Sequence, residues 1–169
     1  MAPTEREERA WVRGAQAGSA SGLEALFRLH WPPALRAAYL VVHDRALAED
    51  IAQEAFLAAV RHLDRFDRRR PFGPWLHRIV VNRAIDASRA RTARREVELD
   101  ERLPAREPSP PDDAVLSRLA TLPPDQRAVV VLRHLLEYTP GEIAAMLELP
   151  RGTVNSRLRR GLDAMRDLG

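Results

Sequence analysis

The fold of this chain is decided by residues 139–162, which read TPGEIAAMLELPRGTVNSRLRRGL. Thr139 and Glu142 have the spacing of a capping box, with Pro140 at the first helical position, so a short helix begins there. Residues 148–150 form a turn that ends this helix, and an arginine-rich second helix follows. A short helix, a tight turn and a second helix in this order predict a helix-turn-helix unit.

The second helix of this unit combines one apolar stripe with several polar faces. Val154, Leu158, Leu162 and Met165 recur at helical spacing, so we expect them to pack inward. Arginine donates bidentately to guanine, asparagine pairs with adenine, and a hydroxyl group adapts to either base, which suits a helix in the major groove of DNA. The alternative is an ordinary helical hairpin with a solvated basic face. The expected DNA contacts are Arg151, Thr153, Asn155, Ser156, Arg157, Arg159 and Arg160.

Upstream of this unit, apolar residues recur at helical spacing nearly everywhere, and no stretch predicts a strand convincingly. Thr4 with Glu7, and Ser21 with Glu24, have capping-box spacing, and Asp44 is a candidate N-cap. The expected helices cover about residues 4–17, 21–42 with an interruption at Trp31-Pro32-Pro33, 44–62 and 73–95.

Residues 96–111 hold prolines among acidic side chains and show no apolar periodicity. Such a composition is typical of a linker. The sequence therefore predicts an all-α protein with two small helical domains, over residues 1–95 and 112–169, joined by a Pro-rich acidic linker. The helix-turn-helix lies in the second domain.

The charge of the chain is unevenly distributed. Its 27 basic residues, all arginine, and its 24 acidic residues leave a net charge of only +3. Residues 61–95 carry a net charge of +8, residues 96–127 one of −4, and residues 151–166 one of +4. One charged run usually marks a solvated helix face, whereas two separate arginine clusters favour a polyanionic partner such as nucleic acid.

The composition excludes several classes of protein. The chain has no cysteine, which excludes a disulfide framework, a thiolate zinc site and a cysteine nucleophile. The five histidines lack close metal-ligand spacing, and no glycine loop could cradle a phosphate, so we expect no metal and no cofactor. The charged N-terminus does not resemble a signal peptide, and no apolar run is long enough to insert into a membrane, so we expect a cytoplasmic protein.

Arginines and aromatic rings lie close together in residues 66–75, which read FDRRRPFGPW. Cations that follow the phosphates and rings that hold unstacked bases are what binding to a single strand requires. Each ring alone fits core packing somewhat better, so the functional interpretation rests on the cluster. The expected contacts to a melted strand, including the outer face of the next helix, are Arg68, Arg69, Arg70, Phe72, Trp75, Arg78, Asn82, Arg83 and Arg89.

One face of the third expected helix presents Asp50, Gln53, Glu54 and Leu57, while we expect Val60 on its buried side. The polar face fits simple solvation at least as well as a surface that binds a partner protein. Two carboxylates four residues apart also resemble an acid/base pair or a metal site, but no histidine lies nearby at ligand spacing.

Taken together, these stretches resemble a bacterial sigma factor of the extracytoplasmic-function (ECF) group. Order and spacing agree with that family over about residues 10–95 and 112–168. The resemblance rests on AEDIAQEAF at 48–56, the segment 66–82, LPPDQR at 122–127, and EIA at 142–144 with GTVNSRL at 152–158.

The resemblance implies partners and a function without catalysis. Asp50, Gln53, Glu54 and Leu57 would dock on the β′ clamp helices of core RNA polymerase. The segment 66–89 would recognise and help melt the −10 promoter element. The helix-turn-helix would read the −35 element of the promoter DNA and contact the β flap, and a separate anti-sigma factor would regulate the protein.

The chain departs from the family pattern at Asn155, where arginine or lysine is common, at Leu162, where arginine is common, and in residues 67–71. Its promoter preferences are therefore expected to differ. Two other classes stay open: a helix-turn-helix regulator that dimerises on DNA without polymerase, and a nucleic-acid enzyme that uses Asp50, Glu54 or Asp86 with a metal.

Overall fold

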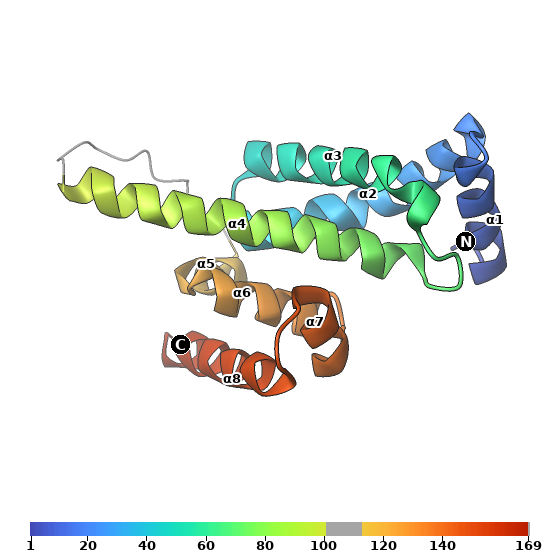
Figure 1. Ribbon diagram of the computed structural model, residues 1–169. Helices are drawn as coiled ribbons and strands as arrows, with labels where there is room; N and C mark the ends of the chain where they lie inside the picture. The colour runs from blue at the N-terminus through green and yellow to red at the C-terminus, as the bar shows by residue number, and fades with distance from the viewer. Residues whose placement is uncertain (101–112, 169) are drawn as a thin grey trace.

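The computed structural model describes the backbone of residues 1–100 and 113–168, which contains helices and connecting loops and, within those ranges, no strand (Figure 1). The expected all-α class is confirmed. Before residue 101 the elements are α1 (Glu5–Gln16), α2 (Ala20–Val42), α3 (Arg45–Arg61), the 3₁₀ turn η1 (Leu63–Arg65) and α4 (Phe72–Asp100). After residue 112 they are α5 (Ala114–Thr121), α6 (Pro124–Val130), the π-helical turn η2 (Val131–Leu135), α7 (Pro140–Leu147) and α8 (Arg151–Asp167).

Helices α2, α3 and α4 lie alongside one another, and α1 crosses their end next to the N-terminus (Figure 1). Leu26 of α2 and Leu76 and Val80 of α4 are fully buried between them. Gly22 lies where α2 meets α1: a Cβ atom there would come within 2.7 Å of the Trp11 carbonyl oxygen. This close crossing fixes α1 beside the loop that joins η1 to α4.

Helix starts follow the sequence where the cap is local, and differ where it is not. Thr4 forms the expected capping box, and the Asp44 side chain accepts a hydrogen bond from the Leu47 amide at 3.0 Å. The expected box at Ser21 is wrong, because Ser19 is the N-cap and accepts from the Gly22 amide. The expected interruption in α2 is also wrong: the helix passes through Pro32 and Pro33, since buried residues on both sides hold its two halves in line.

Helix α4 is longer than expected. It runs to Asp100, five residues into the segment that we expected to be linker from residue 96. Arginines at 89, 91, 94 and 95 are good helix formers and nothing in this stretch breaks a helix. The prolines of the expected linker, in 101–111, lie outside the described residues.

The second group of helices packs α8 against α6 and α7. Thr139 forms the expected capping box with Glu142, and Glu148 ends α7 in a left-handed conformation (φ 54°). Val154 and Leu158 are buried as expected, but Leu162 is 39% exposed, so its expected inward position is wrong. Gly161 takes the buried position instead, because a Cβ there would already lie 2.9 Å from Cγ2 of Val130.

The two groups of helices contact each other along α2 and α4 (Figure 1). The guanidinium of Arg127 in α6 donates to the Val41 carbonyl of α2 at 2.6 Å, and also to carbonyls at the end of α5. His77 Nδ1 and the Tyr138 hydroxyl are hydrogen-bonded at 2.7 Å. Among the described helices, none combines the length and the apolar character needed to cross a membrane.

Candidate polymerase and nucleic-acid interfaces

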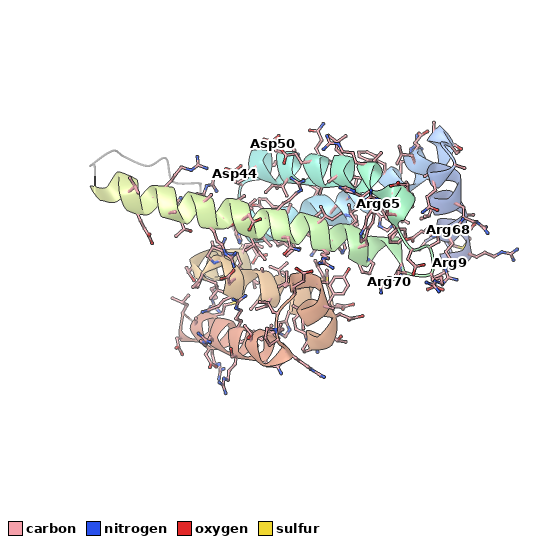
Figure 2. All side chains as sticks on the ribbon, viewed as in Figure 1. Arg9, Asp44, Asp50, Arg65, Arg68 and Arg70 are labelled. Atoms are coloured by element: carbon pink, nitrogen blue, oxygen red, sulfur yellow. The ribbon has the colours of Figure 1, made fainter. Side chains whose placement is uncertain are left out.

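The outer face of α3 presents acidic and apolar side chains together. Asp50, Gln53 and Glu54 are exposed, and Leu57 is 51% exposed (Figure 2 labels Asp50). Val60, which we expected on the buried side, is 41% exposed and lies one turn from Leu57. Leu57 and Val60 thus add two exposed apolar side chains next to the carboxylates of this face.

This face is connected to α4 by an ion pair. Glu54 Oε2 accepts a hydrogen bond from Arg83 Nη1 at 3.0 Å; the Glu54 side chain is exposed and that of Arg83 is half-buried. A residue expected to bind polymerase therefore contacts one expected to bind DNA. An ion pair with this much solvent access contributes little to stability.

The loop between η1 and α4 is anchored at its start and left arginine-rich at its tip. The side-chain amide of Gln16 in α1 donates to the carbonyls of Leu63 and Phe66 at 2.8 and 3.0 Å. The carboxylate of Asp67 accepts from the amide and guanidinium of Arg69, and these hydrogen bonds lower the pKa of Asp67. Arg68 and Arg70 are exposed beside them (Figure 2).

The aromatic residues of this segment form one cluster, with ring centroids of Phe66 and Trp75 4.6 Å apart and those of Phe72 and Trp75 5.6 Å apart. Phe72 is 3% exposed, so the expected contact of its ring with a base is wrong for this conformation. The Phe72 ring packs against His30 and Phe66 on one side and contacts the Trp75 ring on another.

Trp75 lines a hollow of about 380 Å³ beside the loop. His62 and Arg65 were not expected here, although Arg65 directly precedes Phe66 and lies in the basic block of residues 61–95. An aromatic edge surrounded by cations has the composition of a site for an unstacked base and its phosphate. The lining residues are His62, Arg65, Phe66, Asp67, Arg70, Trp75 and Arg78.

The outer face of α4 is not open in this structure, because α6 and α7 lie against it. Arg78 pairs with Glu148, and Arg89 pairs with Asp125, each at 2.5 Å. The side-chain amide of Asn82 donates to the Met146 carbonyl at 3.4 Å. Three of the side chains expected to contact a melted strand, Arg78, Asn82 and Arg89, thus contact the second group of helices.

The exposed face of α8 carries four of the expected DNA contacts, Arg151, Asn155, Arg159 and Arg160. Thr153 and Ser156 are half-buried. The Ser156 hydroxyl donates to the Thr153 carbonyl and accepts from Arg160, so it orients that guanidinium.

Arg157 differs from the other arginines of α8. Its side chain is only 23% exposed and lies 3.8 Å from Asp125, the same carboxylate that Arg89 of α4 contacts. In this conformation Arg157 therefore faces α6 rather than the open side of α8. Asp125 brings together one arginine from each expected DNA-binding surface.

Two buried histidines lie where the helix groups meet. Burial and the nearby charge of Arg127 lower the pKa of His43 to about 4, and burial lowers that of His77 to about 4. Burial also lowers the pKa of Arg127 to about 10, so Arg127 stays charged at neutral pH while both histidines are neutral. In residues 1–100 and 113–168, no group of three or more histidines and carboxylates could hold a metal ion.

Sequence comparisons place both halves of the chain. The family described as Sigma-70 region 2 matches residues 26–94, and the one described as Sigma-70, region 4 matches residues 112–165. ECF RNA polymerase sigma factor SigW of Bacillus subtilis is 37% identical over 139 residues, covering 70% of this chain and 73% of the relative. SigL of Mycobacterium tuberculosis is 34% identical over 164 residues and covers 92% and 93%. The chain spans 60% of the longer SigE of Mycolicibacterium smegmatis, at 36% identity.

Solved structures have the same fold. CnrH, in complex with the cytosolic domain of CnrY, is 28% identical with a TM-score of 0.70, covering 95% of this chain and 96% of CnrH. RpoE of Bartonella quintana, in complex with the anti-sigma factor NepR, has a TM-score of 0.68 over 86% of this chain and 94% of RpoE. At 24% identity, the second likeness concerns the fold alone.

Proposed function

The chain belongs to the ECF group of RNA polymerase sigma factors, which bind core polymerase and direct it to promoters, and we propose that it does so through three separate surfaces. It is a transcription initiation factor and not an enzyme, since phosphodiester synthesis belongs to the polymerase. The observation that carries the proposal is the order of three surfaces along the chain: an acidic and apolar face on α3, an arginine-rich loop after it, and an exposed basic face on α8.

The first surface is the α3 face of Asp50, Gln53, Glu54 and Leu57, which we assign to the β′ clamp helices of core polymerase. Exposed apolar side chains beside carboxylates support a docking role there. Loss of the two charges should weaken binding to core polymerase in the absence of DNA. The variant to test is Asp50→Ala with Glu54→Ala, measured by fluorescence anisotropy with labelled protein.

Arg83→Ala is the matched control for this variant. It breaks the Glu54–Arg83 ion pair without changing the α3 face, so affinity for core polymerase without DNA should stay at the wild-type value. If Arg83→Ala weakens core binding as much as the double substitution does, the α3 face is not the docking surface.

The second surface is the loop 66–71 with Trp75, Arg78, Asn82 and Arg89, which binds the melted −10 element. The hollow beside Trp75 supports this assignment, because it offers an aromatic edge and several cations to one flipped base. Contacts from α4 require that α6 and α7 first leave its outer face.

The third surface is the exposed face of α8, which reads the −35 element in the major groove. Arg151, Asn155 and Arg159 point to solvent from the first three turns of the helix. Each surface alone makes few contacts, so free DNA binding is weak, and tethering both readers to one polymerase supplies the affinity through effective concentration.

One experiment separates this function from the two alternatives. Purified core polymerase with this protein should produce promoter-specific transcripts from a promoter library, and neither component alone should do so. A symmetric footprint by the isolated protein would favour a dimeric helix-turn-helix regulator, and metal-dependent turnover of nucleic acid would favour an enzyme.

A partner that holds the chain inactive is also part of the proposal. CnrH, which is similar over nearly the whole chain, was solved in complex with the cytosolic domain of CnrY. We assign to this chain a protein partner that acts as an anti-sigma factor and binds in competition with core polymerase. Adding that partner to the transcription reaction should abolish the transcripts, and excess core polymerase should restore them.

A further inference from the structure

A second hollow lies on the other side of the loop 66–71, between the loop and α1. It measures about 730 Å³ and is lined by five arginines and a single acidic residue. Figure 2 shows Arg9 of α1 next to Arg68 and Arg70 of the loop, at the end of the molecule that holds the N-terminus. The lining residues are Thr4, Glu5, Arg6, Arg9, Arg13, Arg68 and Arg69.

Helix geometry places the arginines of α1 in this hollow. Arg6, Arg9 and Arg13 follow one another at intervals of three and four residues, so they share one face of α1. Val12 is 2% exposed and holds the helix against the bundle. Crossing of α1 over α2 at Gly22, and the hydrogen bonds from Gln16 to the loop, fix the two walls relative to each other.

Most of the positive charge in the hollow is not neutralised within the protein. Arg9 lies 3.6 Å from Glu5, and Arg69 is bonded to Asp67. Arg6, Arg13 and Arg68 have no ion pair within the described part of the chain. Like charges held together without counter-charges favour a polyanion in the hollow.

The hollow lacks what a base-binding site needs. No aromatic side chain lines it, whereas the hollow across the loop contains Phe66 and Trp75. Guanidinium groups without a stacking surface contact phosphates rather than bases. A smaller hollow of about 40 Å³ shares Arg9 and Arg68 with this hollow and Arg70 with the hollow at Trp75, and Glu5 and Glu8 also line it.

We propose that this hollow, the α1–loop hollow, binds the backbone phosphates of the single DNA strand where it leaves the base-binding hollow at Trp75. The inference rests on the proposed function, since it needs a melted strand held on the loop. It adds α1 to the DNA-binding surface and assigns it a contact that is independent of base sequence. Neutralised phosphates release counterions, so the contact makes binding dependent on salt.

The test measures the salt dependence of DNA binding by the complex of core polymerase with this protein. One probe is a fluorescein-labelled forked DNA with the sequence of a promoter that the wild-type protein transcribes in the library reaction. The other is the same fork with a scrambled single strand. Arg6→Ala with Arg9→Ala and Arg13→Ala should reduce the slope of log K against log salt by about 2, since each single-strand phosphate contact contributes about 0.7. The reduction should be equal for both probes.

Two matched variants control this result. Replacing the same three arginines by lysine should keep the slope, because a point charge is enough for a phosphate, whereas a bidentate base contact would be lost. Replacing the exposed Arg28, Arg36 and Arg94 by alanine removes the same net charge elsewhere and should also keep the slope. If the triple alanine variant unfolds at a lower temperature, Arg6→Ala with Arg13→Ala serves instead, with an expected reduction of about 1.4.

An unchanged slope in the triple alanine variant overturns the inference. A loss confined to the promoter strand would also overturn it, because it would mean base recognition. A weaker affinity for core polymerase with an unchanged slope would assign the hollow to a protein interface. Failure of the proposed function is distinguishable from all of these, since the wild-type protein would then yield no promoter-specific transcripts.

Discussion

At the scale of single residues, Gly161 allows α8 to approach α6 closely, because it has no Cβ atom. A Cβ at this position would lie 2.9 Å from Cγ2 of Val130 and 3.6 Å from Cδ1 of Leu122, both of which are buried. Alanine normally stabilises a helix by about 0.5–1 kcal/mol relative to glycine. Here overpacking outweighs that gain, so we expect Gly161→Ala to lower the free energy of unfolding by about 1–2 kcal/mol in urea denaturation.

Gly152 offers a control in the same helix. A Cβ there meets no atom within 4 Å, so Gly152→Ala carries the helix preference without the clash. We expect it to leave the free energy of unfolding unchanged or slightly raised. Equal effects of the two substitutions would mean that α8 and α6 separate at no cost.

His43 makes stability depend on pH. Its pKa is about 4 in the folded protein and about 6.5 in an unfolded chain, so below pH 6.5 the unfolded state binds the extra proton first. The contribution of neutral His43 to the free energy of unfolding is therefore fully present above pH 6.5 and is lost as the pH falls toward 4. For a pKa of about 4, the free energy of unfolding drops by roughly 2 kcal/mol between pH 7 and pH 5.

His43→Asn should remove this loss. Asparagine tolerates the left-handed backbone of residue 43 (φ 52°) and does not titrate. His77 has the same pKa of about 4 in the folded protein and still titrates in the variant. In urea unfolding, the drop in the free energy of unfolding between pH 7 and pH 5 should therefore be about half as large in the variant as in the wild type. Parallel pH curves for the variant and the wild type would show that His43 is accessible to protons in the folded protein.

At the scale of elements, α8 divides its arginines between two directions. Arg159 is exposed, whereas Arg157 faces Asp125 of α6. We expect Arg159→Ala to weaken binding of the polymerase complex to its −35 element by about 1–3 kcal/mol, and to relax the preference at one base pair, in a competition assay with promoter variants. Arg157→Ala should cost less, and a uniform loss over all sequences would mark either arginine as a phosphate contact.

Elements whose cause is local could be predicted from the sequence. The capping boxes at Thr4 and Thr139 and the N-cap at Asp44 depend on side chains within three residues, and they are present. Predictions failed where distant packing decided the outcome. α2 continues through two prolines because its neighbours bury both halves, and Gly161 replaces Leu162 inside because α6 lies so close.

The candidate site shows the same division. Much of the exposed faces of α3 and α8 follows from helical periodicity, since Asp50, Glu54 and Arg159 are exposed as that periodicity predicts. Val60 and Leu162, which it predicts to be buried, are exposed as well. Phe72 is buried because His30 and Phe66 lie against it, which no local pattern indicates. The arginines of α1 were not expected beside the loop 66–71, since only the crossing of α1 and α2 brings them there.

At the scale of the whole molecule, the two groups of helices cover each other's expected DNA contacts. Arg78 and Arg89 of α4 pair with Glu148 and Asp125, and the latter also attracts Arg157 of α8. Each of these two guanidinium groups donates through its Nη2 atom to a carboxylate, and α6 and α7 lie against this face of α4. If α4 binds DNA as proposed, we expect this arrangement to open first, and binding energy from polymerase is available to open it.

The ion pair between Arg89 and Asp125 should contribute measurably to this closed arrangement. An exposed pair is worth at most about 1 kcal/mol, so we expect Asp125→Ala to raise the ratio of open to closed molecules roughly two- to fivefold. Because the chain has no cysteine, dyes on Ala46→Cys and Asp167→Cys, two exposed positions on α3 and α8, report the separation of the groups by energy transfer. Asp163→Ala is the control, since its partner Arg166 lies in the same helix and the pair does not join the two groups.

Salt should raise the ratio of open to closed molecules as Asp125→Ala does, because the screening length falls to about 3 Å at 1 M. Energy transfer that neither the substitution nor 1 M salt changes would mean that Arg127, His77 and Tyr138 hold the groups together without help from the exposed ion pairs.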